Sequence, residues 1–221
     1  YYGGDIKGIT QKIKAGYFKD LGINTIWISP ITQNPIDAWG QFNNPDTKFS
    51  GYHGYWPITS TSVDYRLGNS ADVKEMLRTA HSNGLSVLLD YVANHVHEQH
   101  AVYQKHKDWV TPLYLPDGTM NTEKWDEHRL TTWFDTFLPT LDLEKQEVTD
   151  FMVDSAIYWI TEYDFDGFRH DATKHIPNNF WRTLNKKVKK VSQEKGKYIY
   201  QIGETYGSHE LINSYIGSGL L

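Results

Sequence analysis

Segments with the apolar spacing of helices alternate with short apolar runs typical of buried strands along most of this chain. Apolar residues four apart over residues 9–21 predict a helix that Gly22 ends, and residues 25–28 follow as a buried strand. The same pair recurs as a helix over 71–81 and a strand over 85–90. Repeated alternation of helix and strand with short turns is the pattern of βα units around a parallel sheet.

Two more pairs follow a long polar and aromatic stretch over about residues 96–138. Helices are predicted over 147–163 and 180–194, and strands over 167–169 and 198–202. Two architectures fit this order, a doubly wound sheet and a (β/α)8 barrel. No glycine-rich phosphate-binding loop follows any strand, which disfavours a nucleotide-binding sheet. Polar residues instead collect where strands end, the face on which barrels carry their active sites, so we favour the barrel.

Composition excludes several classes of protein and of site. The 221 residues include 22 basic and 27 acidic side chains, a net charge of −5, which argues against a nucleic-acid-binding protein. The absence of cysteine excludes a disulfide scaffold, a thiolate metal site and a cysteine nucleophile. No apolar run approaches the roughly 18 residues of a membrane span, so we predict no such span in this segment.

Two carboxylates follow neighbouring predicted strands. Asp171 lies two residues after Arg169 on an extended segment, and Glu204 follows the next strand. Strand ends of a barrel face one mouth, so the carboxylates can converge as the pair that glycoside hydrolysis requires. Arg169 would hold Asp171 ionised, as a nucleophile requires. An ordinary buried ion pair at a strand end is the alternative interpretation.

Two further clusters have a structural and a functional interpretation each. Asp90, Asn94 and His95 end an earlier strand; His95 could be a satisfied core histidine, or Asn94 with a distant carboxylate could bind a hard cation. The segment 52–57 holds three aromatic residues and His53, which could fill a loop or stack on sugar rings.

Several ordered motifs together resemble the α-amylase family of glycoside hydrolases, family 13. The resemblance covers essentially the whole chain and rests on order, spacing and strand context. The motifs are Gly3-Gly4-Asp5-Ile6-Lys7-Gly8-Ile9, Tyr52 to Trp56, Asp90-Tyr91-Val92-Ala93-Asn94-His95, Phe137-Leu138-Pro139-Thr140-Leu141-Asp142, Gly167-Phe168-Arg169-His170-Asp171-Ala172-Thr173-Lys174-His175 and Ile202-Gly203-Glu204.

The resemblance implies a retaining double-displacement mechanism. Asp171 takes the place of the nucleophile, Arg169 positions it, and Glu204 takes the place of the acid/base. Carboxyl groups about 5–5.5 Å apart would fit that stereochemical outcome. Asp90 would brace Arg169 or the loop.

The resemblance also implies substrate contacts. His95 would bond hydroxyls of the sugar at the cleavage point, and Tyr55 would stack on that sugar with His53 and Trp56 close by. Lys174 would reach the sugar on the leaving-group side.

A structural calcium ion is a further implication of the family. Asn94, Asp142 and a backbone carbonyl at His175 match its ligands, and Asp135 is an additional candidate. Oxygen ligands from distant segments suit Ca²⁺. The ion would pin the insertion onto the barrel.

The family pattern implies that this chain is part of a larger catalytic domain. Residues 1–95 and 139–221 would form about strands two to five of a (β/α)8 TIM barrel, and 96–138 the inserted B domain after strand three. The family's third catalytic Asp, in a Phe-x-x-x-His-Asp motif, has no match after Glu204. We therefore expect the isolated segment to be inactive and prone to aggregate.

The function implied is endo-acting hydrolysis of α-1,4-glucosidic bonds in starch- or glycogen-type glucans or malto-oligosaccharides. The Lys174-His175 pair favours an α-amylase over its relatives. A glucanotransferase, a maltogenic or cyclodextrin-degrading enzyme, and a non-catalytic binding or scaffold relative remain alternatives. Since polymeric starch cannot enter a cell, a secreted, cell-surface or periplasmic location is expected.

Overall fold

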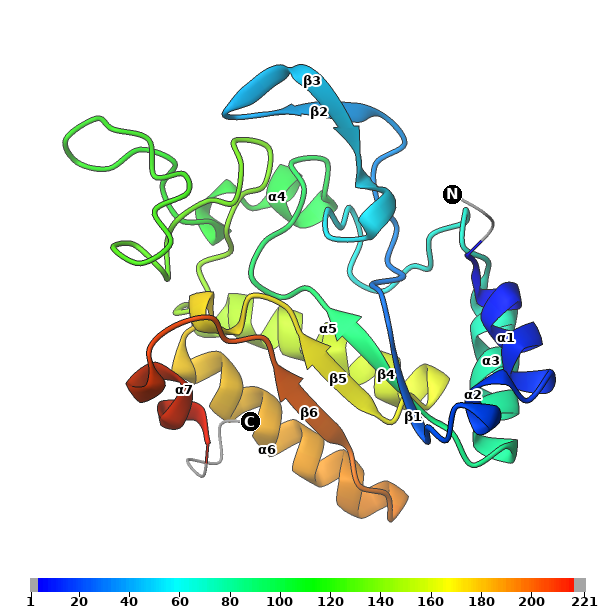
Figure 1. Cartoon of the computed structure of the whole chain (residues 1–221). Helices are drawn as coiled ribbons and strands as arrows, with labels where there is room; N and C mark the ends of the chain where they lie inside the picture. Colours follow the sequence, from blue (N-terminus) through cyan, green and yellow to red (C-terminus); the bar gives the residue numbers. More distant parts are fainter. Residues whose placement is uncertain (1–3, 217–221) are drawn as a thin grey trace.

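Four parallel strands form the sheet at the centre of the molecule (Figure 1). The structure is a computed structural model that describes residues 4–216, so residues 1–3, with Gly3 of the first motif, and residues 217–221 lie outside the described residues. The strands lie in chain order, which is β1 (Thr25–Ile28), β4 (Ser86–Tyr91), β5 (Gly167–His170) and β6 (Tyr200–Gly203). A doubly wound sheet reverses its strand order at a switch point. This order has no reversal, so the barrel-type prediction is confirmed as a partial α/β barrel.

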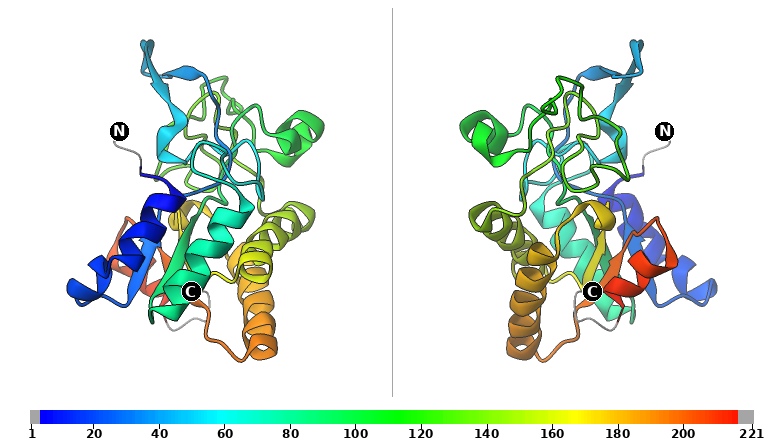
Figure 2. Two further views of the ribbon diagram at one scale, coloured as in Figure 1. Left: turned by 90° about the vertical axis from the view of Figure 1, so that its right-hand side faces the viewer. Right: turned by 90° about the vertical axis from the view of Figure 1, so that its left-hand side faces the viewer.

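The long helices form one layer that follows the same order (Figure 2). α1 packs on α3, α3 contacts α5, and α5 packs on α6. The bounds of these helices are α1 Ile6–Lys14, α3 Ser70–Ser82, α5 Gln146–Tyr163 and α6 Asn178–Lys195. The core between sheet and helices includes Val87, Leu89 and Phe168, all at most 1% exposed. Strand residues between these point to the opposite face, which becomes the barrel interior.

The connections carry the remaining elements. A hairpin of β2 and β3 and most of the loops lie beyond the carboxyl ends of the strands (Figure 1). The bounds are α2 Tyr17–Asp20, β2 Ala38–Gln41, β3 Asn44–Ser50, η1 Gly51–His53, α4 Ala101–Lys105, η2 Lys107–Trp109, η3 Thr173–His175 and α7 His209–Tyr215. The sequence analysis predicted neither the hairpin nor α7.

The helix predicted over residues 9–21 is wrong as a single element. α1 ends at Lys14, and Gly16 adopts a left-handed backbone with φ 77° before the short α2 begins. Glycine tolerates this conformation because it has no Cβ. Tyr17 and Leu21, the last two apolar residues of the four-residue spacing, are 48% and 58% exposed.

The segment 96–138 lies over the carboxyl end of the sheet as loops with short helical turns. The chain is paired where it enters and leaves this segment, through a bridge between His95 and Thr140 and a hydrogen bond of 3.2 Å from Val96 N to Pro139 O. In the described part of the chain, no helix has both the length and the apolarity to cross a bilayer.

The two edge strands generate a first prediction. Within residues 4–216, β1 and β6 each pair on one side only, and Trp27 and Ile202 are 55% and 52% exposed on them. Unpaired edges with exposed apolar side chains promote association. We expect this chain, expressed alone, to self-associate with rising concentration in light scattering, and Ile202→Lys to reduce the effect. Phe49→Lys, on the hairpin, is the matched control; an equal reduction there would contradict the role of the edge.

Candidate active site

A single guanidinium joins three carboxylates at the carboxyl ends of β4, β5 and β6. Parallel pairing sets Asp90 beside Arg169, and Nη1 of Arg169 lies 2.9 Å from Asp90 Oδ1 and 3.0 Å from Asp171 Oδ1. Nη2 of Arg169 lies 2.8 Å from Glu204 Oε1. The predicted convergence of Asp171 and Glu204 is therefore present, and Asp90 braces Arg169 as expected.

Asp171 is buried immediately after β5. Its backbone N–H donates to Tyr91 O at 3.1 Å, which continues the pairing with β4 past the strand end. Burial raises the pKa of Asp171 from 3.8 to about 7; the Arg169 charge opposes the rise, and the charges of Asp90 and Glu204 add to it. Arg169 thus pairs with Asp171 and favours its ionised form, but desolvation of the carboxyl outweighs this effect on its pKa.

Glu204 differs from Asp171 in its exposure. Its side chain is 50% exposed, and its Oε2 accepts a hydrogen bond from Ala172 N at 3.0 Å. Ala172 has a left-handed backbone with φ 51°, an uncommon conformation for a residue with a Cβ. One carboxylate of the pair is therefore buried and fixed, while the other reaches solvent.

Asp90 connects the ion cluster to the aromatic loop. Its Oδ2 accepts from Tyr55 Oη at 2.7 Å and from Trp27 Nε1 at 3.0 Å. Burial raises the pKa of Asp90, and its hydrogen bonds to Tyr55, Arg169 and Trp27 oppose that rise. The Arg169 guanidinium also lies over the Trp27 ring, 4.9 Å from its centroid. Asp90 thus positions both the cation and Tyr55.

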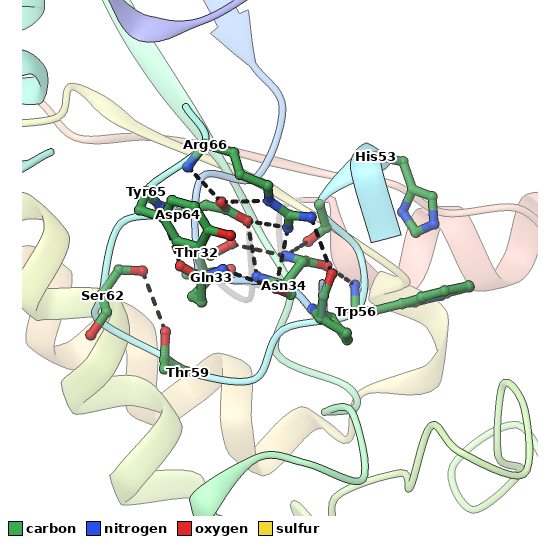
Figure 3. A network of polar contacts seen from close by, with 12 residues as sticks. Thr32, Gln33, Asn34, His53, Trp56, Thr59, Ser62, Asp64, Tyr65 and Arg66 are labelled. Carbon is green, nitrogen blue, oxygen red and sulfur yellow. Dashed lines mark hydrogen bonds and ion pairs between the residues drawn. The ribbon is translucent and has the colours of Figure 1, made fainter. Parts of the chain in front are cut away.

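The turn that carries Tyr55 and Trp56 is held by a buried asparagine (Figure 3). Asn34 is 1% exposed, and its Oδ1 accepts from Trp56 N at 2.7 Å. Its Nδ2 donates to Thr32 O at 2.8 Å and to Gly54 O at 3.1 Å. The side chain therefore satisfies backbone groups on both sides of the turn, as a buried amide requires.

An ion pair supports Asn34 in turn (Figure 3). Asp64 Oδ2 accepts from Asn34 N at 3.1 Å, and Asp64 Oδ1 accepts from Arg66 Nε at 2.9 Å. Arg66 also donates to the carbonyls of Pro35 and Asn34, both at 3.1 Å. Hydrogen bonds from Arg66 and Asn34 lower the pKa of Asp64 although burial opposes them.

His95 is buried beside the same turn. One ring nitrogen, Nε2, lies 3.0 Å from Tyr55 O, and the ring packs on Phe134 with centroids 4.6 Å apart. Burial lowers the pKa of His95 to about 4, so this ring is neutral at physiological pH. The His53 ring stacks on the Tyr55 ring with centroids 5.7 Å apart, and burial lowers the pKa of His53 as well.

A cavity of about 410 Å³ opens over the carboxylates. The predicted site residues that line it are Tyr55, Trp56, His95, Arg169, Asp171 and Glu204. Trp56 contributes little exposed surface, because only 5% of it is accessible. The cavity lining also includes residues that the sequence analysis did not assign to a sugar site, namely Gln41, Phe134, Asp135, Phe137 and Leu138. Asp135 had been only a candidate calcium ligand, and no local signal marked Gln41, since its hairpin was not predicted.

Two predicted substrate contacts lie outside this cavity lining. His53 faces a neighbouring hollow of about 820 Å³ that Trp27 and Tyr55 also line. The Lys174 ammonium lies 3.0 Å from Asp126 Oδ1, and Arg129 donates to the Lys174 carbonyl. Lys174 therefore joins the turn after β5 to the segment 96–138 in this structure.

The three predicted calcium ligands come from separate segments. Asn94 Oδ1 is buried without a hydrogen-bond partner, and Asn94 O accepts from Leu141 N at 2.9 Å, which brings Asp142 into the neighbouring position. The ring Nδ1 of His175 lies 2.7 Å from Arg129 O. Across residues 4–216, no three His, Asp or Glu side chains converge to hold a metal. The predicted calcium ligands include only one such side chain, Asp142, together with an amide oxygen of Asn94 and a backbone carbonyl of His175. The unpaired side-chain oxygen of Asn94 fits a ligand set of this kind.

Comparison with known proteins identifies extended similarity. Residues 2–218 match the family "Alpha amylase, catalytic domain". The chain is 29% identical to alpha-amylase 2 of Dictyoglomus thermophilum, over 97% of this chain and 34% of that protein. It is 30% identical to a cyclomaltodextrinase of Thermoanaerobacter pseudethanolicus, over 88% of this chain and 32% of that protein.

The crystal structure of an alpha-amylase from Geobacillus thermoleovorans, solved with acarbose, is similar in fold. It matches with a TM-score of 0.75 at 33% identity, over 94% of this chain and 42% of that chain. The chain thus spans about a third of the length of the two curated relatives.

The raised pKa of Asp171 generates a second prediction. Because its folded pKa of about 7 exceeds the unfolded value, the folded chain binds more protons between pH 4 and 7, and stability falls as pH rises through this window. Asp171→Asn removes this dependence. In urea unfolding, we expect the free energy of unfolding of the variant relative to wild type to rise by up to about 4 kcal/mol between pH 4 and pH 8. Asp46→Asn, at an exposed carboxylate of the β2–β3 hairpin, should keep the wild-type slope; equal slopes for all three proteins would refute the assignment.

Proposed function

The chain belongs to the alpha-amylase family of glycosidase catalytic domains, and from this premise we propose that it supplies the catalytic pair of an enzyme that cleaves internal α-1,4-glucosidic bonds in starch- or glycogen-type glucans. The observation that carries the proposal is the shared guanidinium of Arg169, which holds Asp171 and Glu204 at adjacent strand ends within one cavity. Two carboxylates held at one sugar-sized site are the equipment of a glycosidase.

In the first step Glu204 donates a proton to the glycosidic oxygen while a carboxylate oxygen of Asp171 bonds to the anomeric carbon. We assign the attack to Oδ2, because Oδ1 accepts from Arg169. The bond to the leaving oxygen breaks, and a glycosyl ester on Asp171 remains. Glu204 then takes a proton from water, whose oxygen attacks the same carbon and releases Asp171 with net retention.

Glu204 must change its contacts for the acid role. Its Oε1 forms an ion pair with Arg169, and its Oε2 accepts a hydrogen bond from Ala172 N. Its half-exposed side chain can turn toward the leaving oxygen, whereas buried Asp171 keeps its place. Tyr55, which Asp90 holds in place, supplies an aromatic face on which the sugar stacks. The neutral ring of His95 binds hydroxyls of the same sugar.

A related activity is the second candidate. Similarity to a cyclomaltodextrinase and to a cyclomaltodextrin glucanotransferase supports action on cyclic glucans or glucan transfer in place of starch hydrolysis, with the same nucleophile and acid. Product analysis on amylose separates these: mixed short oligosaccharides support endo-hydrolysis, and cyclic or elongated products support transfer. The assembled triad of Arg169, Asp171 and Glu204 argues against a purely binding or scaffold role.

The whole protein's activity is part of this proposal, since the chain spans about a third of its curated relatives. The family's third catalytic Asp has no matching motif among the residues after Glu204. We also propose a secreted, cell-surface or periplasmic location, because the polymeric substrate cannot enter a cell.

A third prediction tests the two carboxylates in the full-length protein. Glu204→Gln should slow starch hydrolysis about 10²- to 10⁴-fold and slow a maltosyl fluoride much less, because fluoride leaves without protonation. Asp171→Asn should abolish turnover of both substrates, and an activated fluorosugar should label Asp171 in mass spectrometry. Glu210→Gln, at an exposed glutamate of α7, is the control. Equal loss on both substrates in Glu204→Gln would remove Glu204 from the acid role.

We further propose that Asn94, Asp142 and the backbone of His175 hold a structural Ca²⁺. The unpaired buried oxygen of Asn94 supports this, because a cation would satisfy it. The ion would tie together the two ends of the segment 96–138, at Asn94 and Asp142, and take no part in bond cleavage.

A fourth prediction follows from that site. Calcium should raise the melting temperature of the full-length protein over its value in EDTA, since a ligand at a hundred times its Kd adds about 2.7 kcal/mol. Asp142→Ala should abolish the shift, whereas Asp117→Ala, at an exposed loop of the same segment, should keep it. An undiminished shift in Asp142→Ala would contradict the proposed ligand.

A further inference from the structure

The β2–β3 hairpin brings a polar side chain to the rim of the active-site cavity. Gln41, the last residue of β2, lines the same cavity as Asp171 and Glu204. Its side chain is exposed and makes no hydrogen bond to another of residues 4–216. The primary amide offers a donor and an acceptor side by side, which matches neighbouring sugar hydroxyls.

The tip of the hairpin is fastened to loops of the segment 96–138. The backbone N–H of Phe42 donates to Asp135 Oδ2 at 3.0 Å, and Asp135 is only 5% exposed. The amide of Asn43 donates to both carboxylate oxygens of Glu123, at 2.8 and 2.9 Å. We call these two contacts the tip clasp. They fix the two residues that directly follow Gln41.

The base of the hairpin is fastened independently. The Trp39 ring packs against Phe137 with centroids 5.4 Å apart and against His97 at 4.5 Å. Between base and tip the pairing shifts register at Gly40, where a Cβ would lie 2.2 Å from Pro45 O. Only glycine permits this close approach, and the irregularity redirects the strand just before Gln41.

The Asp135 carboxylate explains why the tip stays at the cavity. Its Oδ1 accepts from Thr136 N at 2.6 Å, so the carboxylate is oriented by its own loop before it meets Phe42. Asp135 lines the cavity as well. The hairpin and this loop therefore meet over the site, although Phe42 and Asp135 are 93 positions apart in the sequence.

We propose that Gln41 is a substrate-specificity residue whose amide binds hydroxyls of a glucosyl unit near the cleavage point, and that the tip clasp is the device that holds it there. The inference rests on the proposed glucan cleavage and adds a contact from a segment remote from the catalytic strands. Gln41 binds the ground state and the transition state alike, because it touches neither the reacting carbon nor the leaving oxygen. It therefore acts on substrate affinity more than on the chemical step.

The test uses maltoheptaose and the full-length protein that carries this chain. Gln41→Ala should raise KM about two- to tenfold, the effect of losing one or two neutral hydrogen bonds, and change kcat less than about twofold. Asn43→Ala should raise KM in the same direction and speed hydrogen exchange at the Phe42 amide, because the clasp is opened. Lys48→Ala, an exposed change on the same hairpin, should alter neither.

The proposed glucan cleavage and the role of Gln41 fail through different results. No turnover by wild type would overturn the proposed function. Wild-type turnover with a Gln41→Ala KM equal to that of Lys48→Ala would overturn the role of Gln41 alone. A normal KM in Asn43→Ala despite faster exchange at Phe42 would show that Gln41 needs no clasp and would overturn that part of the proposal.

Discussion

The active site depends on one buried cation surrounded by three carboxylates. Arg169 is always charged. The pairing of β4 with β5 sets it beside Asp90, so this contact depends on the sheet and not on the loops. Asp171 shares Nη1 of Arg169 with Asp90, and Glu204 contacts Nη2. Burial raises the pKa of Asp171, and the repulsion from Asp90 and Glu204 adds to this rise. Removing Arg169 would leave these charges uncompensated in a poorly solvated site.

The site keeps several features that lower stability. Asp171 is desolvated, Ala172 has a left-handed backbone, and the Asn94 side-chain oxygen is buried without a partner. Each of these persists because the packed layer of sheet and helices over-determines it. Such features concentrate at functional sites, and here all three lie at the carboxyl ends of β4 and β5.

Long-range polar contacts place the loops over this frame. Asn34 ties the turn of Tyr55 and Trp56 to the chain after β1, with Asp64 and Arg66 behind it. The tip clasp does the same for Gln41, and Lys174 joins the turn after β5 to the segment 96–138. The cavity walls are thus held by buried or paired polar groups, while its floor belongs to the sheet.

The sequence alone determined the four parallel strands, the three long helices α3, α5 and α6, and the trio Arg169, Asp171 and Glu204, because strand and helix periodicity is local and residues at strand ends face one mouth. It did not determine the break at Gly16, the hairpin, or which polar residues the cavity collects. Only the tertiary structure decided that Gln41 reaches the cavity, that Lys174 contacts Asp126 and that burial outweighs Arg169 at Asp171. These outcomes depend on desolvation and on contacts between residues far apart in the chain, and neither leaves a periodic pattern in the sequence.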